Sequence, residues 1–290
     1  MEITEGRVTE ITCPAPAKLN LFLHVVGKRE DGYHLLETIF RFIDYGDLVH
    51  LRLRDDGHII RIQALEGVSE EQDLCMRAAH LLRQMSGTTL GVEINLEKNL
   101  PMGGGLGGGS SDAASVLLGL NRLWQLNWTR VQLQELALQL GADVPVFIFG
   151  QSAFAQGIGE QLQAVMLEPA WYLVLVPPVH VSTPKIFAHQ QLTRDSKSIR
   201  IADFSRAKKT ISLTRNDLQS VVCLEYQAVE EYLAWLNEYA PARMTGSGAC
   251  VFAEFADEDQ AYKIFALLPN EMRGFVARGI DEHPLYDLAK

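Results

Sequence analysis

The sequence predicts an α+β fold. Strand-like and helix-like segments interleave along the 290 residues, but without the strict alternation of a doubly wound parallel sheet. The composition, 47% hydrophobic and 21% charged, is that of a globular chain long enough for one large domain or two moderate ones. The pattern of strands restarts just after Gly150. We therefore expect two domains, residues 1–152 and 153–290.

The N-terminal half is expected to begin with a strand. In "AKLNLFLHVV" (17–26), leucine recurs at every second position from Leu19 to Leu23, and this period of two is typical of a strand with one buried face. Further strands are expected over 36–43, 47–55, 58–65 and 91–99, and a helix over 70–87, with Gly87 as its stop signal.

A glycine-rich loop precedes the next helix. The stretch "NLPMGGGLGGGSSDAASVLLGL" (99–120) places six glycines within residues 103–109, and an apolar stripe from Ala113 to Trp124 has helical spacing. The remaining expected elements are a helix over 128–140, strands over 152–157, 171–178, 248–255 and 274–280, a polar surface loop over 193–210, and helices within 216–239 and over 257–268.

Two common phosphate-loop motifs do not fit this loop. Gly103, Gly105 and Gly108 have the G-x-G-x-x-G spacing, but "EKNLPM" separates them from the preceding strand. No carboxylate stands about 20 residues later, as a dinucleotide-binding fold requires. A Walker A loop ends in lysine followed by serine or threonine, whereas this loop ends Gly109-Ser110 without a lysine.

The physical basis of both motifs still applies. Consecutive glycines let backbone N–H groups approach an anion, and a helix N-terminus adds unsatisfied donors and partial positive charge. The alternative is a structural turn in which Ser110, Ser111 or Asp112 caps the helix. Six glycines cost roughly 0.5–1 kcal/mol each relative to alanine, more than a cap requires. We therefore predict phosphate binding, with capping as a part of the explanation.

Other motifs are ambiguous when taken singly. Lys18 could be a surface charge at a strand end, and "KREDGYH" is a turn that exposes Tyr33 and His34. Asp143 in "GADVP" could be a turn or N-cap residue. "TGSG" (245–248) before an apolar strand is, alone, a turn.

Charge and cysteines restrict the partners. The formal charge of −10 argues against nucleic acid or an anionic membrane as partner, but not against an anionic small substrate. The four cysteines lie far apart without a C-x-x-C pair, as expected of free thiols in a reducing compartment. With no signal peptide or membrane-length apolar run apparent, we expect a cytoplasmic protein.

Taken together, the motifs resemble those of the GHMP kinase superfamily, whose phosphate loop has the form P-x-x-x-G-L-G-S/G-S-S/G. Four blocks, "PAKLNLFLHVVGKREDGYH", "LPMGGGLGGGSSDAA", "GADVPVF" and "RMTGSGACVF", resemble more narrowly the 4-diphosphocytidyl-2-C-methyl-D-erythritol kinase family of non-mevalonate isoprenoid synthesis. They stand in that family's order and cover the chain from about Pro14 to Phe252.

The resemblance implies a two-domain GHMP kinase-like fold with the active site in the cleft between domains. Residues 1–152 would form an ATP-phosphate-binding domain with a ribosomal-S5-like α+β fold, and residues 153–290 a GHMP kinase domain with a ferredoxin-like sheet. The implied activity is ATP-dependent phosphorylation of the 2-hydroxyl of 4-diphosphocytidyl-2-C-methyl-D-erythritol. Mg²⁺ is expected, held mainly through phosphates and water, with no protein metal site.

The resemblance also assigns site residues. Lys18 and Asp143 match the catalytic pair. Asp73 departs from the family, which usually has asparagine there near the nucleotide base. The ATP phosphate site matches Pro101, Met102, Gly103, Gly104, Gly105, Leu106, Gly107, Gly108, Gly109, Ser110 and Ser111; the substrate site matches Asn20, Tyr33, His34, Thr183 and Phe187; the supporting third motif matches Thr245, Gly246, Ser247 and Gly248.

These residues suit phosphoryl transfer, in which positioning and charge stabilisation carry most of the catalysis. Lys18 would offset charge on the transferring group and Asp143 would direct the hydroxyl proton. A lysine beside an aspartate stabilises the carboxylate, so orientation should matter more than base strength. A pyrimidine would stack between Tyr33 and Phe187.

Two alternative functions are a superfamily kinase acting on mevalonate or homoserine, and a nucleotide-binding module without catalysis. The oligomeric state stays open.

Overall fold

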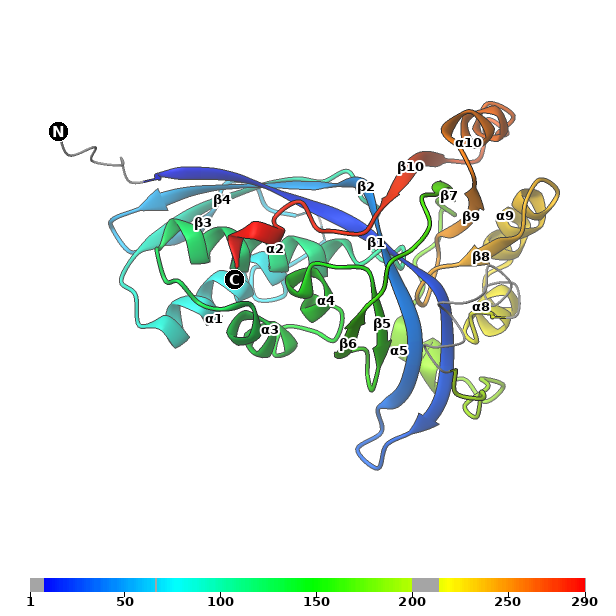
Figure 1. Ribbon diagram of the computed structural model, residues 1–290, viewed down its shortest axis with the longest axis horizontal. Coiled ribbons are helices and arrows are strands. Elements are labelled where there is room, and N and C mark those ends of the chain that lie inside the picture. The colour runs from blue at the N-terminus through cyan, green and yellow to red at the C-terminus, as the bar shows by residue number, and fades with distance from the viewer. Residues whose placement is uncertain (1–7, 66, 200–213, 290) are drawn as a thin grey trace.

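The strands of the described residues form one ten-stranded sheet. The computed structural model describes residues 8–65, 67–199 and 214–289. The main path of the sheet is β3-β4-β2-β10-β7-β9-β8, with β1 and β5 also paired to β2 and β6 paired to β5. Figure 1 shows helices α1 to α4 packed along one side of the long β1–β2 ribbon, and α8, α9 and α10 at its other end. The prediction of an α+β fold is confirmed.

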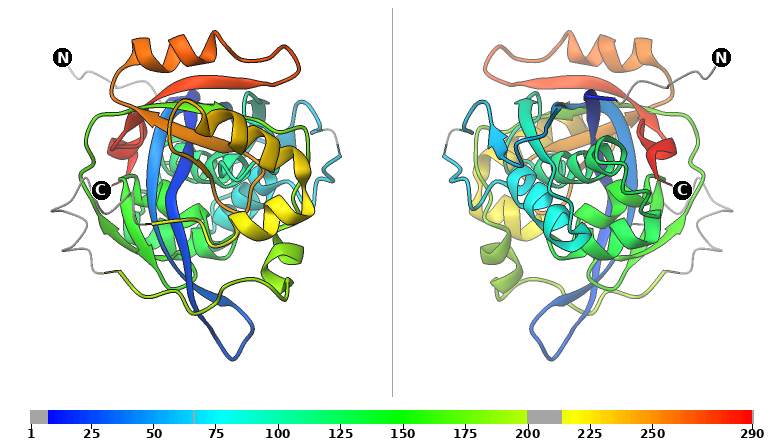
Figure 2. Two further views of the ribbon diagram at one scale, coloured as in Figure 1. Left: turned by 90° about the vertical axis from the view of Figure 1, so that its right-hand side faces the viewer. Right: turned by 90° about the vertical axis from the view of Figure 1, so that its left-hand side faces the viewer.

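Two long antiparallel strands form the axis of the sheet. β1 (Glu10–Lys28) pairs with β2 (His34–Arg54), and the hairpin between them projects from the molecule (Figure 2). The expectation of separate strands over 36–43 and 47–55 is wrong. Pro16 pairs with Gly46 and Ala17 with Ile43, so two residues of β2 bulge out between these pairs. The bulge bends the strand without ending it.

The N-terminal part builds its core between this ribbon and four helices. α1 (Leu74–Ser86) ends where Gly87 adopts φ 69°, as the sequence predicted, and begins at its N-cap Asp73. Buried apolar residues of the strands and of all four helices form one hydrophobic cluster. The other elements here are β3 (Ile59–Arg61), β4 (Gly91–Glu97), α2 (Gly108–Leu123), α3 (Arg130–Leu138), α4 (Val144–Phe149), β5 (Ala153–Gln156) and β6 (Gln161–Ala164).

The C-terminal part has the strand order β10-β7-β9-β8 in a β-α-β-β-α-β sequence, which is ferredoxin-like topology. Its sheet joins β2 through two residue pairs of β10, and the division at residue 152 stays a prediction. Residues 200–210 of the expected polar loop lie outside the described residues. The elements are β7 (Trp171–Leu175), α5 (Thr183–Ala188), α8 (Gln219–Glu225), α9 (Gln227–Asn237), β8 (Ala242–Met244), β9 (Val251–Phe255), α10 (Glu258–Phe265), β10 (Gly274–Ile280) and η1 (Tyr286–Leu288).

Helix α2 is attached to the edge of β1 that β2 leaves free. The hydroxyl of Ser115 donates to the carbonyl of Pro14 at 2.9 Å, and that of Ser111 to the carbonyl of Pro16 at 2.7 Å. Proline lacks an N–H and is tolerated at such an edge. The next alternate residue, Lys18, donates its backbone N–H to Leu106 of the glycine loop at 3.0 Å. The loop is therefore fixed relative to β1.

Within the described ranges, no helix combines the length and the apolar character that crossing a lipid bilayer requires.

Candidate active site

Two cavities meet between the two parts of the chain. The first, of about 370 Å³, is lined by Gly103, Gly105 and Gly107 of the glycine loop, by residues 180–184 and by the 246–248 turn; we call it the loop cavity. The second, of about 750 Å³, lies between the β1–β2 hairpin and α5; we call it the hairpin cavity. The residues that line both are Lys18, Asp143, Thr183, Pro184, Gly246 and Ser247.

Lys18 and Asp143 lie together where the cavities join. Lys18 Nζ is 3.4 Å from Asp143 Oδ2 and donates to Asn20 Oδ1 at 2.6 Å. The Lys18 residue is only 2% exposed, whereas the Asp143 side chain is 40% exposed. Asp143 stands at the N-cap position of α4 but its side chain makes no capping bond. Its carboxylate is thus open to a ligand while the ammonium is held in place.

The first turn of α2 has no capping side chain among the described residues, so its backbone N–H groups are left without one. Gly107, at φ 73°, is the N-cap, and no described side chain caps this helix. The expectation that Ser110, Ser111 or Asp112 would be the cap is wrong, because all three lie inside the helix. Ser110 lines the hairpin cavity, while Ser111 is buried against β1. The uncapped first turn leaves N–H donors and the positive end of the helix dipole for an anion.

Several glycines of the loop are required by close packing, apart from any role in binding phosphate. Gly103, Gly105 and Gly107 have positive φ. A Cβ on Gly105 would collide with the backbone carbonyl of Thr245, and one on Gly104 would lie 2.7 Å from Cys250 Sγ. Part of the glycine content therefore reflects contact with the third-motif turn, which the sequence alone did not indicate. Of the other loop residues, Leu106 is buried and Met102 is exposed.

The third-motif turn, residues 245–248, connects the site's parts. Thr245 Oγ1 accepts the Asn20 backbone N–H at 3.0 Å and lies 3.3 Å from the Gly105 carbonyl. The hydroxyls of Ser247 and Thr183 are 2.6 Å apart. Asn216 Nδ2 donates to the carbonyls on either side of Thr245, at 2.8 Å each. The turn thus ties β1, the glycine loop and α5 together.

Aromatic residues line the hairpin cavity. Tyr33 is 60% exposed at the hairpin tip. The His34 ring lies on Phe187, with centroids 5.0 Å apart and planes at 31°. The pKa of His34 is lowered by burial and then by the cations Arg194 and Lys28. Asn20, Thr183 and Phe187 also line this cavity, so the structure brings together all five residues predicted to hold the substrate.

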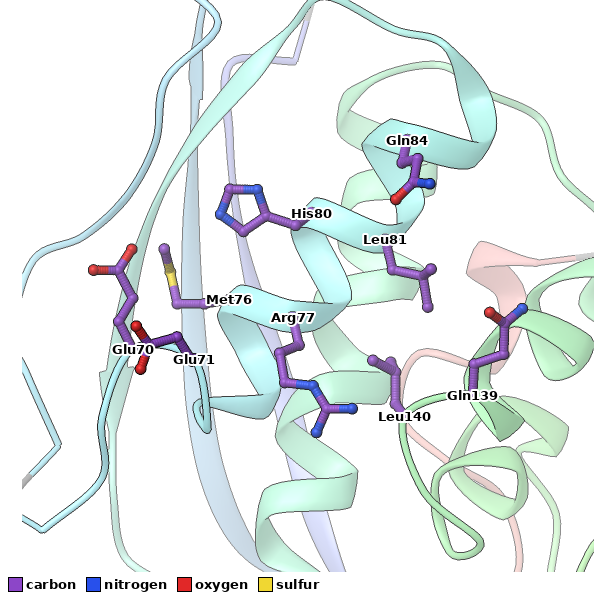
Figure 3. A pocket seen from close by; sticks show the side chains of 9 residues that line it. All are labelled: Glu70, Glu71, Met76, Arg77, His80, Leu81, Gln84, Gln139 and Leu140. Atoms are coloured by element: carbon purple, nitrogen blue, oxygen red, sulfur yellow. The ribbon is translucent and has the colours of Figure 1, made fainter.

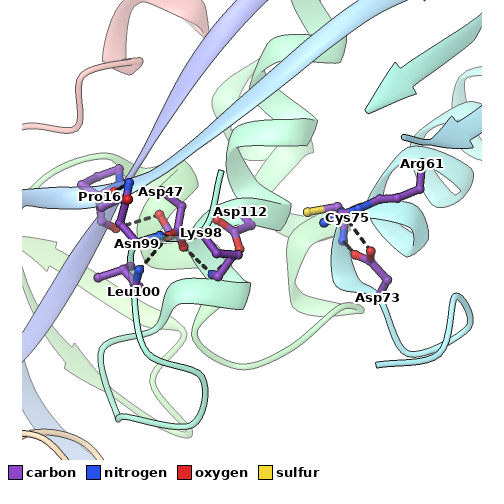
Figure 4. Close-up of polar contacts among 11 residues, drawn as sticks. Pro16, Asp47, Arg61, Asp73, Cys75, Lys98, Asn99, Leu100 and Asp112 are labelled. Carbon is purple, nitrogen blue, oxygen red and sulfur yellow. Dashed lines mark hydrogen bonds and ion pairs between the residues drawn. The ribbon is translucent and has the colours of Figure 1, made fainter. Parts of the chain in front are cut away.

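Acidic residues of β2, of α2 and at the start of α1 are paired within the protein (Figure 4). Lys98 Nζ contacts the carboxylates of both Asp47 and Asp112, the latter at 2.9 Å. Asp73 Oδ1 accepts the Cys75 backbone N–H at 2.8 Å, and its Oδ2 lies 2.9 Å from Arg61 Nη1. Asp73, the departure from the family pattern, therefore caps α1 and pairs with a buried arginine.

Sequence reasoning missed His180 and Arg194. A Cβ on Gly103 would collide with the His180 ring, which lines the loop cavity. Arg194 donates to His34 Nε2 at 3.2 Å. Neither residue belongs to a recognisable motif, and both are brought to the site by segments flanking α5, so no local signal could have found them.

A further hollow, of about 590 Å³, lies on the outer side of α1 (Figure 3). Met76, Arg77, His80 and Leu81 of α1 line it opposite Leu140. It contains none of the motif residues.

Comparisons with known proteins agree with the motifs. Residues 73–151 match the model of the GHMP kinases N terminal domain, and residues 196–274 that of the GHMP kinases C terminal. The 4-diphosphocytidyl-2-C-methyl-D-erythritol kinase of Thiobacillus denitrificans is 61% identical over 94% of this chain and 97% of its own. That of Nitrosospira multiformis is 58% identical over 97% and 95%.

Solved structures show the same relation. A crystal structure of 4-(cytidine 5'-diphospho)-2C-methyl-D-erythritol kinase has a TM-score of 0.78 at 31% identity, covering 93% of this chain and 99% of that one. A mevalonate kinase has a TM-score of 0.67 at 14% identity, covering 94% and 100%. The second likeness shows a shared fold alone.

We predict that Gly105→Ala destabilises the protein and weakens ATP binding. A non-glycine residue at positive φ costs about 1–3 kcal/mol, and the new Cβ would meet the Thr245 carbonyl. Urea unfolding and nucleotide titration measure the two effects. In the control Gly109→Ala, the nearest atom to the new Cβ is Leu74 Cδ1 at 3.6 Å, so the free energy of unfolding should hold or rise. Equal stability of the two variants would contradict the packing argument.

A second prediction concerns pH. Burial raises the pKa of Asp112 from 3.8 to about 7, opposed by Lys98 and reinforced by Asp47. The folded protein thus keeps a proton that the unfolded chain has lost between about pH 4 and 7. The stabilisation that this proton provides is present below pH 4 and disappears as the pH rises through 7, at up to about 1.4 kcal/mol per pH unit.

Asp112→Asn should abolish this dependence. Between pH 5 and 8, the free energy of unfolding of the wild type should fall by about 1–3 kcal/mol relative to that of the variant, as measured by urea titration at each pH. Glu135→Gln, which changes an exposed carboxylate of α3, should keep the wild-type profile. Parallel curves for wild type and Asp112→Asn would show that Asp112 does not carry the effect.

Proposed function

The chain belongs to the 4-diphosphocytidyl-2-C-methyl-D-erythritol kinase family of GHMP kinases, and we propose that its two joined cavities hold ATP and the cytidine substrate. It is a small-molecule kinase that phosphorylates the 2-hydroxyl of 4-diphosphocytidyl-2-C-methyl-D-erythritol in non-mevalonate isoprenoid synthesis. The observation that carries the site assignment is the Lys18–Asp143 pair at the junction of the cavities.

The loop cavity suits the phosphates of ATP. The uncapped α2 N-terminus and three glycines at positive φ present backbone donors without side-chain obstruction. Lys18, which lines this cavity, supplies a positive charge. An anion bound here is therefore attracted both by the backbone N–H groups and by the Lys18 ammonium. In this arrangement the γ-phosphoryl group lies closest to the hairpin cavity.

The hairpin cavity suits the cytidine diphosphate part of the substrate. Tyr33 and Phe187 offer aromatic faces, and stacking of a base on such a side chain contributes roughly 1–3 kcal/mol. His34 and Asn20 add hydrogen-bonding groups, and Lys28 lines the cavity with a cation that can face a diphosphate. The cavity ends at Asp143, so a substrate anchored by its base extends its alcohol toward that carboxylate.

The chemistry follows from this placement. A hydroxyl that donates a hydrogen bond to Asp143 is oriented toward the γ-phosphoryl group, and its proton moves to that carboxylate as the new P–O bond forms and the bond to ADP breaks. Lys18 stabilises negative charge on the transferring group, and it does so in a buried setting that strengthens the attraction. We expect Asp143 to act mainly by orienting the hydroxyl.

We propose that Mg²⁺ accompanies the nucleotide. The Ser110 hydroxyl lines the hairpin cavity and is an oxygen donor of the kind that Mg²⁺ prefers. In the part of the chain that the structure describes, no group of three or more histidine, cysteine, aspartate or glutamate side chains could hold a metal. The residues fit an ion held largely through phosphate and water, whose charge would offset that of the phosphates.

A panel of acceptors tests the function. ADP release with ATP and Mg²⁺ should occur with the cytidine substrate and stay at background with mevalonate or homoserine, which have no base to stack on the aromatic residues of the hairpin cavity. Turnover of mevalonate in place of the cytidine compound would overturn the substrate assignment. ATP binding without turnover on any acceptor would favour a nucleotide-binding module.

Asp143→Asn should lower kcat by about 10²–10⁴-fold, because the amide neither accepts the proton nor orients the hydroxyl as a carboxylate does. ATP affinity, measured by calorimetry, should change little. Asp44→Asn is a matched control: its carboxylate is 39% exposed and lies 3.6 Å from Arg278, away from both cavities. Near-wild-type turnover of Asp143→Asn would remove Asp143 from the mechanism.

A further inference from the structure

A polar segment after α5, residues 189–199, is fixed to the hairpin by two buried carboxylates. Glu37 accepts hydrogen bonds from Ser198 Oγ at 2.5 Å and from the Ile199 backbone N–H at 2.8 Å. Asp217 accepts from Ser196 Oγ at 2.6 Å and from the backbone N–H of Val25 in β1 at 2.8 Å. Glu37 and Asp217 are 2% and 3% exposed. The segment is therefore anchored along β1 and β2, at the back of the hairpin cavity.

Arg194 lies in this segment and joins α5 to the hairpin. Its Nη2 donates to the carbonyls of Phe187 at 3.0 Å and His189 at 2.8 Å, at the C-terminal end of α5. Its Nη1 donates to the Leu192 carbonyl at 3.1 Å, and its Nε donates to His34 Nε2 at 3.2 Å. One guanidinium thus contacts both residues whose rings lie 5.0 Å apart in the cavity wall.

The contact also determines the protonation of His34. A guanidinium can only donate hydrogen bonds, so His34 Nε2 must accept and the ring hydrogen must be on Nδ1. Burial, Arg194 and Lys28 all lower the pKa of His34. The ring is therefore neutral near pH 7 and carries one N–H donor, which suits an acceptor on the edge of a pyrimidine.

We propose that Arg194 is a positioning residue for the cytidine substrate: it fixes the backbone of Phe187 and the ring of His34, which form one wall of the hairpin cavity, and it keeps the ring hydrogen of His34 on Nδ1. The proposal rests on the proposed function, because it takes the hairpin cavity as the place where the base binds. Arg194 contacts neither Lys18 nor Asp143, and it acts on the substrate through His34 and Phe187.

Arg194→Met tests the proposal by steady-state kinetics. It removes four hydrogen bonds from the wall, so KM for the cytidine substrate should rise by about 10–100-fold. KM for ATP and kcat should stay within about threefold, because the loop cavity and the Lys18–Asp143 pair are unchanged. Arg278→Met, which alters an arginine on β10 that lines neither cavity, is the matched control and should keep all three constants.

The pH profile separates positioning from a general structural role. Without Arg194, one of the two cations acting on His34 is lost, so the pKa of His34 should rise and its ring should charge at a higher pH. KM for the cytidine substrate should then decrease as the pH falls from 8 to 6 in Arg194→Met, because the protonated ring always carries a hydrogen on Nδ1, whereas the neutral ring without Arg194 can carry it on Nε2 instead. In the wild type and in Arg194→Lys, which keeps the charge but cannot make four bonds, this profile should be nearly flat.

The outcomes are distinct. A selective rise in KM for the cytidine substrate, with the altered pH profile and partial recovery in Arg194→Lys, supports the proposal. Unchanged kinetics, or equal changes in both KM values with a lowered Tm, overturn it. If Arg194→Met does not fold, Arg194→Lys decides by whether its KM for the cytidine substrate alone is raised. Absence of turnover in the wild type would instead refute the proposed function.

Discussion

Three hydrogen bonds made by alternate residues of β1 set the geometry on which the site depends. The carbonyls of Pro14 and Pro16 accept serine hydroxyls from α2, and the backbone N–H of Lys18 reaches the glycine loop. Since α2 begins within that loop, its position along β1 determines where its free N–H groups lie. The lysine side chain comes from the same strand residue that makes the third bond. The start of α2, where we propose that the anion binds, and the lysine are thus fixed to each other by the backbone.

The environment of Lys18 explains how its charge can act on phosphate. Burying an ammonium costs several kcal/mol unless partners compensate, and here Asn20 and Asp143 do so. Asn20 is in turn fixed, because its Nδ2 donates to Thr38 at 2.9 Å and its backbone N–H donates to Thr245. The third-motif turn therefore acts through Asn20 as well as through the loop. Low exposure weakens solvent screening, so the ammonium attracts an incoming phosphate more strongly than a surface lysine does.

The sequence predicted local features better than their tertiary partners. Alternating leucines located β1, and Gly87 located the end of α1, because both signals depend on neighbouring residues. The continuity of β2 could not be predicted, since it depends on the register against β1 that bulges out two residues. The α2 cap was wrong because Ser111 and Asp112 have stronger partners across the fold, in β1 and Lys98. Lys18 and Asp143 were identified only through the family resemblance, and Arg194 has no motif at all.

The distribution of charge shows why a chain of net charge −10 can take two anionic substrates. Carboxylates near the site are engaged within the protein: Lys98 contacts Asp47 and Asp112, and Arg61 pairs with Asp73. Glu37 and Asp217 are buried as anchors for the segment that carries Arg194. The cavities themselves offer Lys18, Lys28 and the uncapped helix start. The attraction on a bound anion comes from these local groups, because salt screens the effect of exposed charges that lie more than about 10 Å away. The overall negative charge of the chain therefore does not oppose binding. The carboxylates that line the hairpin cavity are Asp31, which pairs with Arg29, and Asp143, for which we propose the role of orienting the reacting hydroxyl.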